Sequence, residues 1–426
     1  MKSKAWLVLG STLSFLALLP VPVSRAAARQ DRLVINGDGS TFAYPMYRKW
    51  IEEYEKDNPA VHLTYVSNGS GAGIHDIMMG TVDYAGTDGP LTKTQMLDFS
   101  THRNCDVLHF PLAIGANVPI YNVPGVTQDL NFTPRALAGI FLGTITKWND
   151  PEIAKANPHV AIPGHLIVVV RRQDGSGTTY VWTDYLSKFS SDWRQRVGTG
   201  ISVTWPVGIA AKGNEGVAQT VARTPYSIGY AELTYAVRNR LLYGSVANRS
   251  GRFVKADLAS VTAAAEGVAD KMPADFRVSI TDAPGEDAYP ISSFTWMLIP
   301  SVITNSAKRT AIIKFLQWGL TRGQDYLETL SYARLPDAVL AREEKALDEI
   351  KVSSEAGQQR TNLCHGNLPF PDRSNGVPER PDERTAIMKK QADASQRDWE
   401  LCRLYVDEMN RKGLCAHEPW ESELEI

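Results

Sequence analysis

Short apolar runs, glycine-rich loops and helix-like spacings of apolar residues follow one another in a fixed order along this chain. The first unit has an apolar run at 33–35, a polar loop at 37–41 and apolar residues at helical spacing from Tyr47 to Tyr54. A proline at position 45 is tolerated in the first turn of a helix, and Pro59 ends that helix. We therefore predict a strand, a loop and a helix in this order.

The same order returns immediately afterwards. An alternating run at 61–66 predicts a strand, and the loop 67–73 leads into a short helix through Ile77. A third strand at 82–85 ends at Thr87 and Asp88. Strands joined by helices form βαβ units, so these segments predict a largely parallel sheet.

A second α/β region begins near residue 165. The run 166–170 is wholly apolar, as expected of a strand that is buried on both faces, and the loop 171–178 separates it from a helix through Val181. Ligands of open α/β sheets bind at the carboxyl ends of the strands. Two such regions in one chain therefore predict a ligand cleft between two domains.

Both ends of the chain differ from this pattern. Residues 1–28 combine a basic start, an apolar run and three alanines, which is typical of a signal peptide cleaved near Ala28. No later stretch is long and apolar enough to cross a bilayer, so we expect an exported protein that is not membrane-embedded. Residues 356–426 begin with a proline-rich linker and continue with a charged helical pattern, which predicts a helical C-terminal extension.

Composition excludes some classes of function. The chain has 426 residues, of which 43% are hydrophobic and 22% charged, and its formal net charge is −2. A nucleic-acid-binding protein usually carries a large basic surface, which this balance does not favour. Any recognition of an anion must therefore come from local geometry.

The cysteines allow two interpretations. An even number in an exported chain favours disulfide bonds, and we expect one tail cysteine to pair with the cysteine of the body. Metal binding is the rival interpretation, but the spacings match no standard zinc signature, and we expect no metal. The candidates are Cys105, Cys364, Cys402 and Cys415.

The three loops 37–41, 67–73 and 171–178 have features that are typical of anion-binding sites. Each joins a strand to a helix and is rich in Gly, Ser and Thr, and the first turn of a helix offers unpaired N–H groups and a partial positive charge. Arg172 adds a planar cation that can grip two oxygens, and Asp174 lies where it could hold Arg172 in place. Three such loops in one chain predict a site for an oxyanion.

Asp88 narrows the choice of anion. A carboxylate repels an anion unless that anion still carries a proton to donate, and phosphate at neutral pH keeps one whereas sulfate has none. A carboxylate acceptor in the site therefore favours phosphate over sulfate.

Several longer stretches carry a resemblance to a known family. The chain closely resembles the periplasmic phosphate-binding proteins of ABC-type phosphate uptake systems, from about Val34 to about Val352. The stretches that carry the resemblance are 37–42, 69–71, 87–88, 142–150, 172–178, 205–214 and 285–290.

The resemblance implies a fold, a mechanism and a set of ligands. It implies a two-domain α/β periplasmic binding protein type II-like fold with a hinge and an interdomain cleft, in which residues 31–107 and 286–355 form domain I and residues 108–285 form domain II. The resemblance also implies that the protein uses no cofactor and that it delivers phosphate to the membrane permease subunits of an importer. The expected phosphate ligands are Thr41, Phe42, Ser70, Asp88, Arg172, Asp174, Ser176, Gly177 and Thr178.

One residue departs from the family pattern. Asp38 lies where many relatives carry a small neutral residue, and we expect it to cap the glycine-rich turn and point to solvent. If it faced the site, it would weaken the binding of an anion.

Two alternatives use the same scaffold. A phosphatase-like enzyme would need a nucleophile or a metal pair beside the phosphate, and the chain has none of the usual motifs, so we expect no enzyme. A surface interaction protein is the second alternative, and the C-terminal extension is the feature that would support it.

Overall fold

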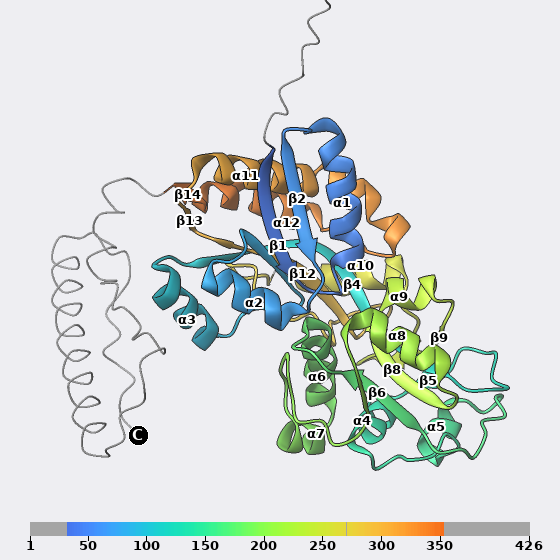
Figure 1. The fold of residues 1–426 in the computed structure, drawn as a ribbon. Coiled ribbons are helices and arrows are strands. Elements are labelled where there is room, and N and C mark those ends of the chain that lie inside the picture. Colours follow the sequence, from blue (N-terminus) through green and yellow to red (C-terminus); the bar gives the residue numbers. More distant parts are fainter. Residues whose placement is uncertain (1–31, 270, 353–426) are drawn as a thin grey trace, which may run out of the picture.

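The computed structural model describes residues 32–269 and 271–352, and these residues form two lobes (Figure 1). We define the first lobe as 32–116 with 292–352, and the second as 117–269 with 271–291. A mixed sheet of nine strands runs through both lobes, in the order β2-β1-β3-β12-β4-β8-β6-β7 with β9 paired to β4. The fold is α/β, as predicted. In the described part of the chain, no helix is both long and apolar enough to span a membrane.

The first lobe contains the opening strand–loop–helix units and the last helices of the described chain. Its strands are β1 (Leu33–Gly39), β2 (Val61–Val66), β3 (Tyr84–Thr87), β12 (Ser292–Pro300), β13 (Val302–Ile303) and β14 (Lys351–Val352). Its helices are α1 (Tyr44–Asp57), α2 (Ser70–Met79), α3 (Lys93–Arg103), α11 (Ser306–Leu320), α12 (Asp337–Ala346) and the 3₁₀ turns η1 (Arg322–Tyr326), η2 (Glu328–Leu330) and η3 (Leu347–Glu349).

The second lobe repeats the arrangement with shorter strands. It holds β5 (Asn131–Phe132), β6 (Val168–Arg172), β7 (Ile209–Ala211), β8 (Ser227–Glu232), β9 (Leu242–Tyr243), β10 (Ser245–Ala247) and β11 (Phe253–Val254). Its helices are α4 (Pro134–Leu142), α5 (Pro151–Ala156), α6 (Gly177–Phe189), α7 (Ser191–Arg196), α8 (Gly213–Arg223), α9 (Leu233–Arg238) and α10 (Leu258–Ala269).

A single long strand, β4 (Val107–Asn122), belongs to both lobes. Its first part pairs with β12, down to Ala116 opposite Ser292, and from Asn117 onward it pairs with β8 instead. The Asn117 N–H also donates to the carbonyl of Ile291, just before β12 begins. The chain therefore passes between the lobes at two neighbouring points, and the predicted division at 107/108 and 285/286 stays a prediction.

The sheet is less parallel than the sequence predicts. β1 pairs in parallel with β2 and β3, and β6 pairs in parallel with β7 and β8. β12 and β4, however, are antiparallel to each of their neighbours. The prediction of a largely parallel sheet is wrong in the middle of the molecule, because the local pattern of the early units says nothing about these two crossing strands.

Two large apolar clusters support the lobes, and the larger one extends from the second lobe into β12 and α11 of the first. In the first lobe, α1 places Trp50 against Gly319 and Gly323, where any added Cβ would come within 3 Å of the indole ring. In the second lobe the buried aromatic side chains include Trp148, Trp182 and Trp193. Burial of this much aromatic surface fixes the helices against the sheet, so the loops at the strand ends start from rigid supports.

Candidate functional site

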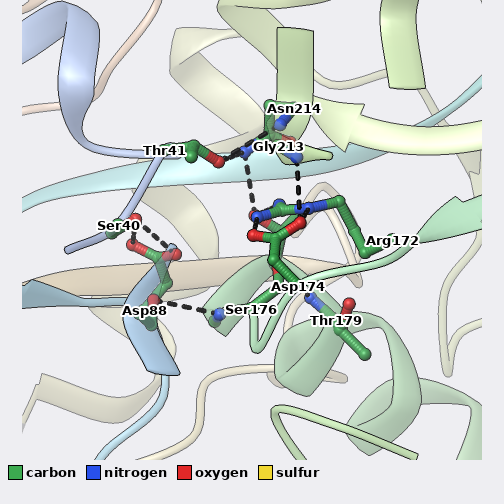
Figure 2. A network of polar contacts seen from close by, with 12 residues as sticks. Ser40, Thr41, Asp88, Arg172, Asp174, Ser176, Thr179, Gly213 and Asn214 are labelled. Carbon is green, nitrogen blue, oxygen red and sulfur yellow. Dashed lines mark hydrogen bonds and ion pairs between the residues drawn. The ribbon is translucent and has the colours of Figure 1, made fainter. Parts of the chain in front are cut away.

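The loops at the carboxyl ends of strands in the two lobes meet face to face. From the first lobe come the β1–α1 loop, the start of α2 and the residue after β3, and from the second lobe come the β6–α6 and β7–α8 loops (Figure 2). The Gly177 N–H donates to Ser70 Oγ at 3.0 Å, and the Gly71 N–H donates to the Gly175 carbonyl at 2.9 Å. We call this contact region the interlobe junction, and the helices α1, α2, α6 and α8 all begin there.

Asp88 is a buried carboxyl group of the first lobe, only 1% exposed. Ser40 Oγ lies 2.6 Å from both of its oxygens, and Thr295 Oγ1 donates to Oδ1 at 2.9 Å. Burial raises the pKa of Asp88 to about 6, although these hydroxyl groups and the positive charge of Arg172 act in the opposite direction. At neutral pH Asp88 is therefore mostly an acceptor held in place by hydroxyl donors.

Arg172 is the buried cation of the second lobe, only 2% exposed. Its Nε donates to Asp174 Oδ1 at 2.9 Å and its Nη2 to Asp174 Oδ2, while Nη1 donates to Thr178 Oγ1 at 3.2 Å. Burial by itself would raise the pKa of Asp174, but the hydrogen bonds and charge of Arg172 outweigh it and lower that pKa. Asp174 therefore holds the guanidinium in a fixed plane.

The remaining predicted residues also lie at the interlobe junction. Thr41 Oγ1 accepts from Asn214 Nδ2 at 2.8 Å, and the Thr41 carbonyl accepts from the Tyr235 hydroxyl at 2.7 Å. The Phe42 carbonyl accepts from the Tyr332 hydroxyl. Ser176 caps α6, where its Oγ accepts from the Thr179 N–H at 3.1 Å. The structure thus brings all nine predicted ligand residues together.

Several residues of the junction were not among the predicted ligands. Ser40 lies inside the first loop, and Asn214 lies inside a stretch that carries the family resemblance, so both could have been found from local signals. Thr295 lies in the middle of β12, and no local signal marks it. It reaches Asp88 only because β12 pairs with β3, with Trp296 opposite Thr87.

Two glycines are needed for the loops to approach one another. A Cβ on Gly177 would lie 2.5 Å from Asp88 Oδ2, so any side chain there would push the α6 N-terminus away from the carboxyl group. Gly69 has a φ of 99°, and a Cβ there would lie 2.4 Å from Asp174 Oδ2. These positions allow backbone from one lobe to touch the charged groups of the other.

The prediction that Asp38 points to solvent is wrong. Asp38 is the sixth residue of β1, is 4% exposed, and accepts from Asn68 Nδ2 at 3.1 Å. Burial raises the pKa of Asp38 to about 6. The strand extends to Gly39 instead of ending before the glycines, and this extension carries the side chain into the space between β1 and α2.

Other candidate chemistry lies away from the junction. Among residues 32–269 and 271–352, no group of three His, Cys, Asp or Glu side chains is arranged to hold a metal ion. His109 accepts from the Leu91 N–H at 3.3 Å, and burial lowers its pKa to about 3. Cys105 is half-buried, whereas Cys364, Cys402 and Cys415 lie outside the described residues, as do the predicted signal peptide and the predicted C-terminal extension.

A groove of about 400 Å³ in the second lobe does not suit an anion. It lies beside β6, β7 and α4 and is lined almost wholly by apolar side chains, including Ile140, Leu166 and Ile209. The interlobe junction instead combines one cation, one carboxyl acceptor, several hydroxyls and four helix N-termini. This set of groups can surround a small oxyanion that still carries a proton.

Comparisons with known proteins agree with this chemistry. A model of the PBP superfamily domain matches residues 24–322. The chain is 38% identical over 326 residues to the phosphate-binding protein PstS of Pasteurella multocida, covering 76% of this chain and 93% of that protein. It is 40% identical over 314 residues to the PstS of Xylella fastidiosa, covering 73% and 84%.

A solved structure has the same fold at lower sequence identity. It is a high affinity periplasmic phosphate-binding protein (PfluDING) bound with phosphate, with a TM-score of 0.61 and 19% identity. The match covers 82% of this chain and 100% of that one.

Proposed function

This chain belongs to the PstS family of phosphate-binding proteins, and from that premise we propose that it captures inorganic phosphate at the interlobe junction. One observation carries the proposal: the buried Asp88 carboxyl faces the N-terminus of α6 and the Arg172 guanidinium across the junction. The donors provide the attraction for an anion. The Asp88 carboxylate can accept a hydrogen bond from a protonated oxygen of the anion.

Charge balance at the junction favours recognition by hydrogen bonds. Asp174 neutralises Arg172, and Asp88 adds a negative charge, so the side chains offer no excess of positive charge. Attraction must then come from N–H groups at helix N-termini and from hydroxyl protons, which are strong donors in a region closed to water. Such donors act only at short range, which favours a ligand that fits closely.

Asp88 provides the selection among oxyanions. Ser40 and Thr295 already donate to it, and its remaining acceptor capacity faces the α6 N-terminus. A phosphate oxygen that carries a proton can donate there, whereas sulfate would leave two acceptors facing each other without a proton between them. We propose that the ligands are Thr41, the backbone N–H of Phe42, Ser70, Asp88, Arg172, Ser176, Gly177 and Thr178, with Asp174 holding Arg172.

Capture requires that the lobes separate and close again. The two crossings between the lobes, at Ala116–Asn117 in β4 and at 291–292 before β12, lie side by side and form a natural hinge. Phosphate favours the closed arrangement because only there do the donors of both lobes reach it.

The setting of the protein follows from the same proposal. We infer that it acts in the periplasm after removal of residues 1–28, and that it delivers phosphate to the membrane permease subunits of an ABC importer. It is a binding protein and not an enzyme, as are the relatives with which it aligns over most of their length. Nothing in the described part of the chain favours the phosphatase-like or the surface-interaction alternative.

Calorimetric titration of phosphate-stripped protein tests the proposal. We expect phosphate to bind with micromolar or tighter affinity, which corresponds to about −8 kcal/mol or more. Arsenate should compete with it, because its shape and protonation are similar, and sulfate should not bind. No binding of phosphate would overturn the function, whereas equal affinity for sulfate would overturn the role given to Asp88.

A further inference from the structure

Asn214 is a fully buried side chain whose every polar group is occupied. It lies in the first turn of α8, in the second lobe, and is 0% exposed. Its Nδ2 donates to Thr41 Oγ1 at 2.8 Å and to Thr178 Oγ1 at 3.0 Å, and its backbone N–H also donates to Thr41 Oγ1 at 3.2 Å. Asn214 therefore contacts a hydroxyl from each lobe.

The orientation of the Asn214 amide is fixed by the backbone. Its Oδ1 accepts from the Glu232 N–H at 3.0 Å. A backbone N–H can only donate, so the oxygen of the amide must face β8 and the NH₂ group must face the two threonines. Asn214 is thereby a donor to both hydroxyls and cannot exchange roles with them.

Counting lone pairs then determines the direction of each hydroxyl proton. Thr41 Oγ1 receives two N–H groups, both from Asn214, and Thr178 Oγ1 receives one from Asn214 and one from Arg172 Nη1 at 3.2 Å. A hydroxyl oxygen has two lone pairs and one proton. Both acceptor positions are filled in each case, and within the described chain neither hydroxyl donates to a protein acceptor. The one remaining hydrogen-bonding role for each threonine is that of a donor.

We propose that Asn214 is a positioning residue that makes Thr41 and Thr178 obligate donors to the bound anion. The proposal rests on the proposed function, in which both threonines bind phosphate. The same arrangement of donors sets the orientation of the phosphate. Its unprotonated oxygens face the two threonines, and its protonated oxygen faces Asp88. Because Thr41 lies in the first lobe and Thr178 in the second, Asn214 completes this arrangement only when the lobes are together.

A thermodynamic cycle separates this role from a purely structural one. Phosphate affinity is measured by calorimetry for N214A, for the double variant T41V/T178V and for the triple variant that combines them. We expect N214A to weaken phosphate binding roughly 30-fold, which is the loss of about one hydrogen bond to a charged ligand. In the T41V/T178V background the same change should cost less than about threefold, because no hydroxyl proton is left to direct.

Asn157 offers a matched control. It is also a buried asparagine of the second lobe, 5% exposed, with its Oδ1 accepting from the Asn131 N–H and its Nδ2 donating to the carbonyls of Asn131 and Ile153. N157A should lower the melting temperature while leaving phosphate affinity within about twofold of the unmodified protein. N214D keeps the size of Asn214 but replaces donors by acceptors, so we expect it to bind phosphate more weakly than N214A.

The outcomes are distinct. If the unmodified protein does not bind phosphate, the proposed function fails and this inference fails with it. If the unmodified protein binds phosphate but N214A or N214D binds equally well, the inference alone is overturned. It is also overturned if N214A costs the same factor in both backgrounds, since Asn214 would then act independently of the two hydroxyls.

Discussion

Each lobe brings a carboxyl group to the interlobe junction, Asp88 fully buried and Asp174 partly buried, and the two groups have opposite properties. In the first lobe, Asp88 is surrounded by hydroxyl donors, and burial raises its pKa to about 6. In the second lobe, Asp174 accepts from Nε and Nη2 of Arg172 and from the Gly213 N–H at 2.9 Å, and its pKa is lowered although partial burial acts to raise it.

The difference shows that the partner of a buried carboxyl, and not burial alone, decides its role. A carboxylate paired to a guanidinium is neutralised and serves as a support for the cation. A carboxylate held only by neutral hydroxyls keeps its charge and some acceptor capacity, so it remains able to recognise a proton on a ligand. The first three of the four predictions that follow alter one side of this contrast at a time, and the fourth tests a buried carboxyl group outside it.

The largest effect is expected when the cation of the second lobe is changed. In R172K a single ammonium nitrogen replaces the planar guanidinium, so the bidentate geometry toward Asp174 and the separate Nη1 that reaches Thr178 are both lost. We expect phosphate affinity to fall roughly a thousandfold, together with a lower melting temperature because Asp174 loses part of its pairing. Calorimetry and thermal melting measure the two losses.

The control for R172K is R322K, which makes the same change in an exposed pair with Asp57 at 2.7 Å. That variant should bind phosphate normally, because exposed ion pairs contribute little. A loss of less than tenfold in R172K would contradict the role given to the planar cation.

The next largest effect is expected at Asp88 in the first lobe, and it concerns the selectivity for phosphate over sulfate. In D88N the side chain gains an NH₂ donor, so the site no longer requires a proton on the ligand. We expect the ratio of phosphate to sulfate affinity to fall roughly a hundredfold, as measured by competition calorimetry. D83N carries the same substitution at the ion pair between Asp83 and Lys308, and it should leave the ratio unchanged. An unchanged ratio in D88N would exclude Asp88 as the selective group.

A smaller effect concerns stability as a function of pH. The pKa of Asp88 is raised from 3.8 to about 6 in the folded protein, so its contribution to stability is fully present below about pH 4 and is lost as pH rises through 6. Two pKa units correspond to about 3 kcal/mol. Urea unfolding of D88N between pH 4 and pH 8 measures this contribution. We expect the free energy of unfolding of D88N to lack this part of the decline.

Asp174 should behave in the opposite sense, because its pKa is lowered. Its contribution is present above its ordinary pKa and is lost as pH falls below it. If the free energies of unfolding of D88N and the unmodified protein had the same pH dependence between pH 4 and pH 6, the comparison between the two carboxyl groups would be wrong.

The smallest effect is expected at Asp38, which is buried beside the first loop but directed toward Asn68. D38N removes a carboxyl group whose ionisation is opposed by burial and keeps an oxygen that can accept from Asn68. We expect a small gain in stability at pH 7 and a change in phosphate affinity of less than about twofold. An affinity that rises tenfold would instead show that the charge of Asp38 acts on the bound anion.

The sequence predicted the fold class, both sets of strand–loop–helix units and the loops that carry the candidate ligands. These features are local, because the spacing of apolar residues and the positions of Gly and Pro restrict the backbone within a few residues. The residues that orient the ligands were harder to predict. Thr295 and Tyr332 lie far along the chain from Asp88 and Phe42, and nothing in their immediate neighbours marks them.

The sequence by itself therefore predicted which loops could hold an anion, and through Asp88 and Arg172 which kind of anion. Only the tertiary structure decided that the two sets of loops face each other, that Asp38 is buried, and that Asn214 directs one hydroxyl from each lobe. The reason is that a hydrogen bond between lobes depends on the pairing of β4 with both β12 and β8. These pairings join residues from 105 positions apart (Asn122 with Ser227) to 193 positions apart (Val107 with Pro300), and local periodicity carries no information about them.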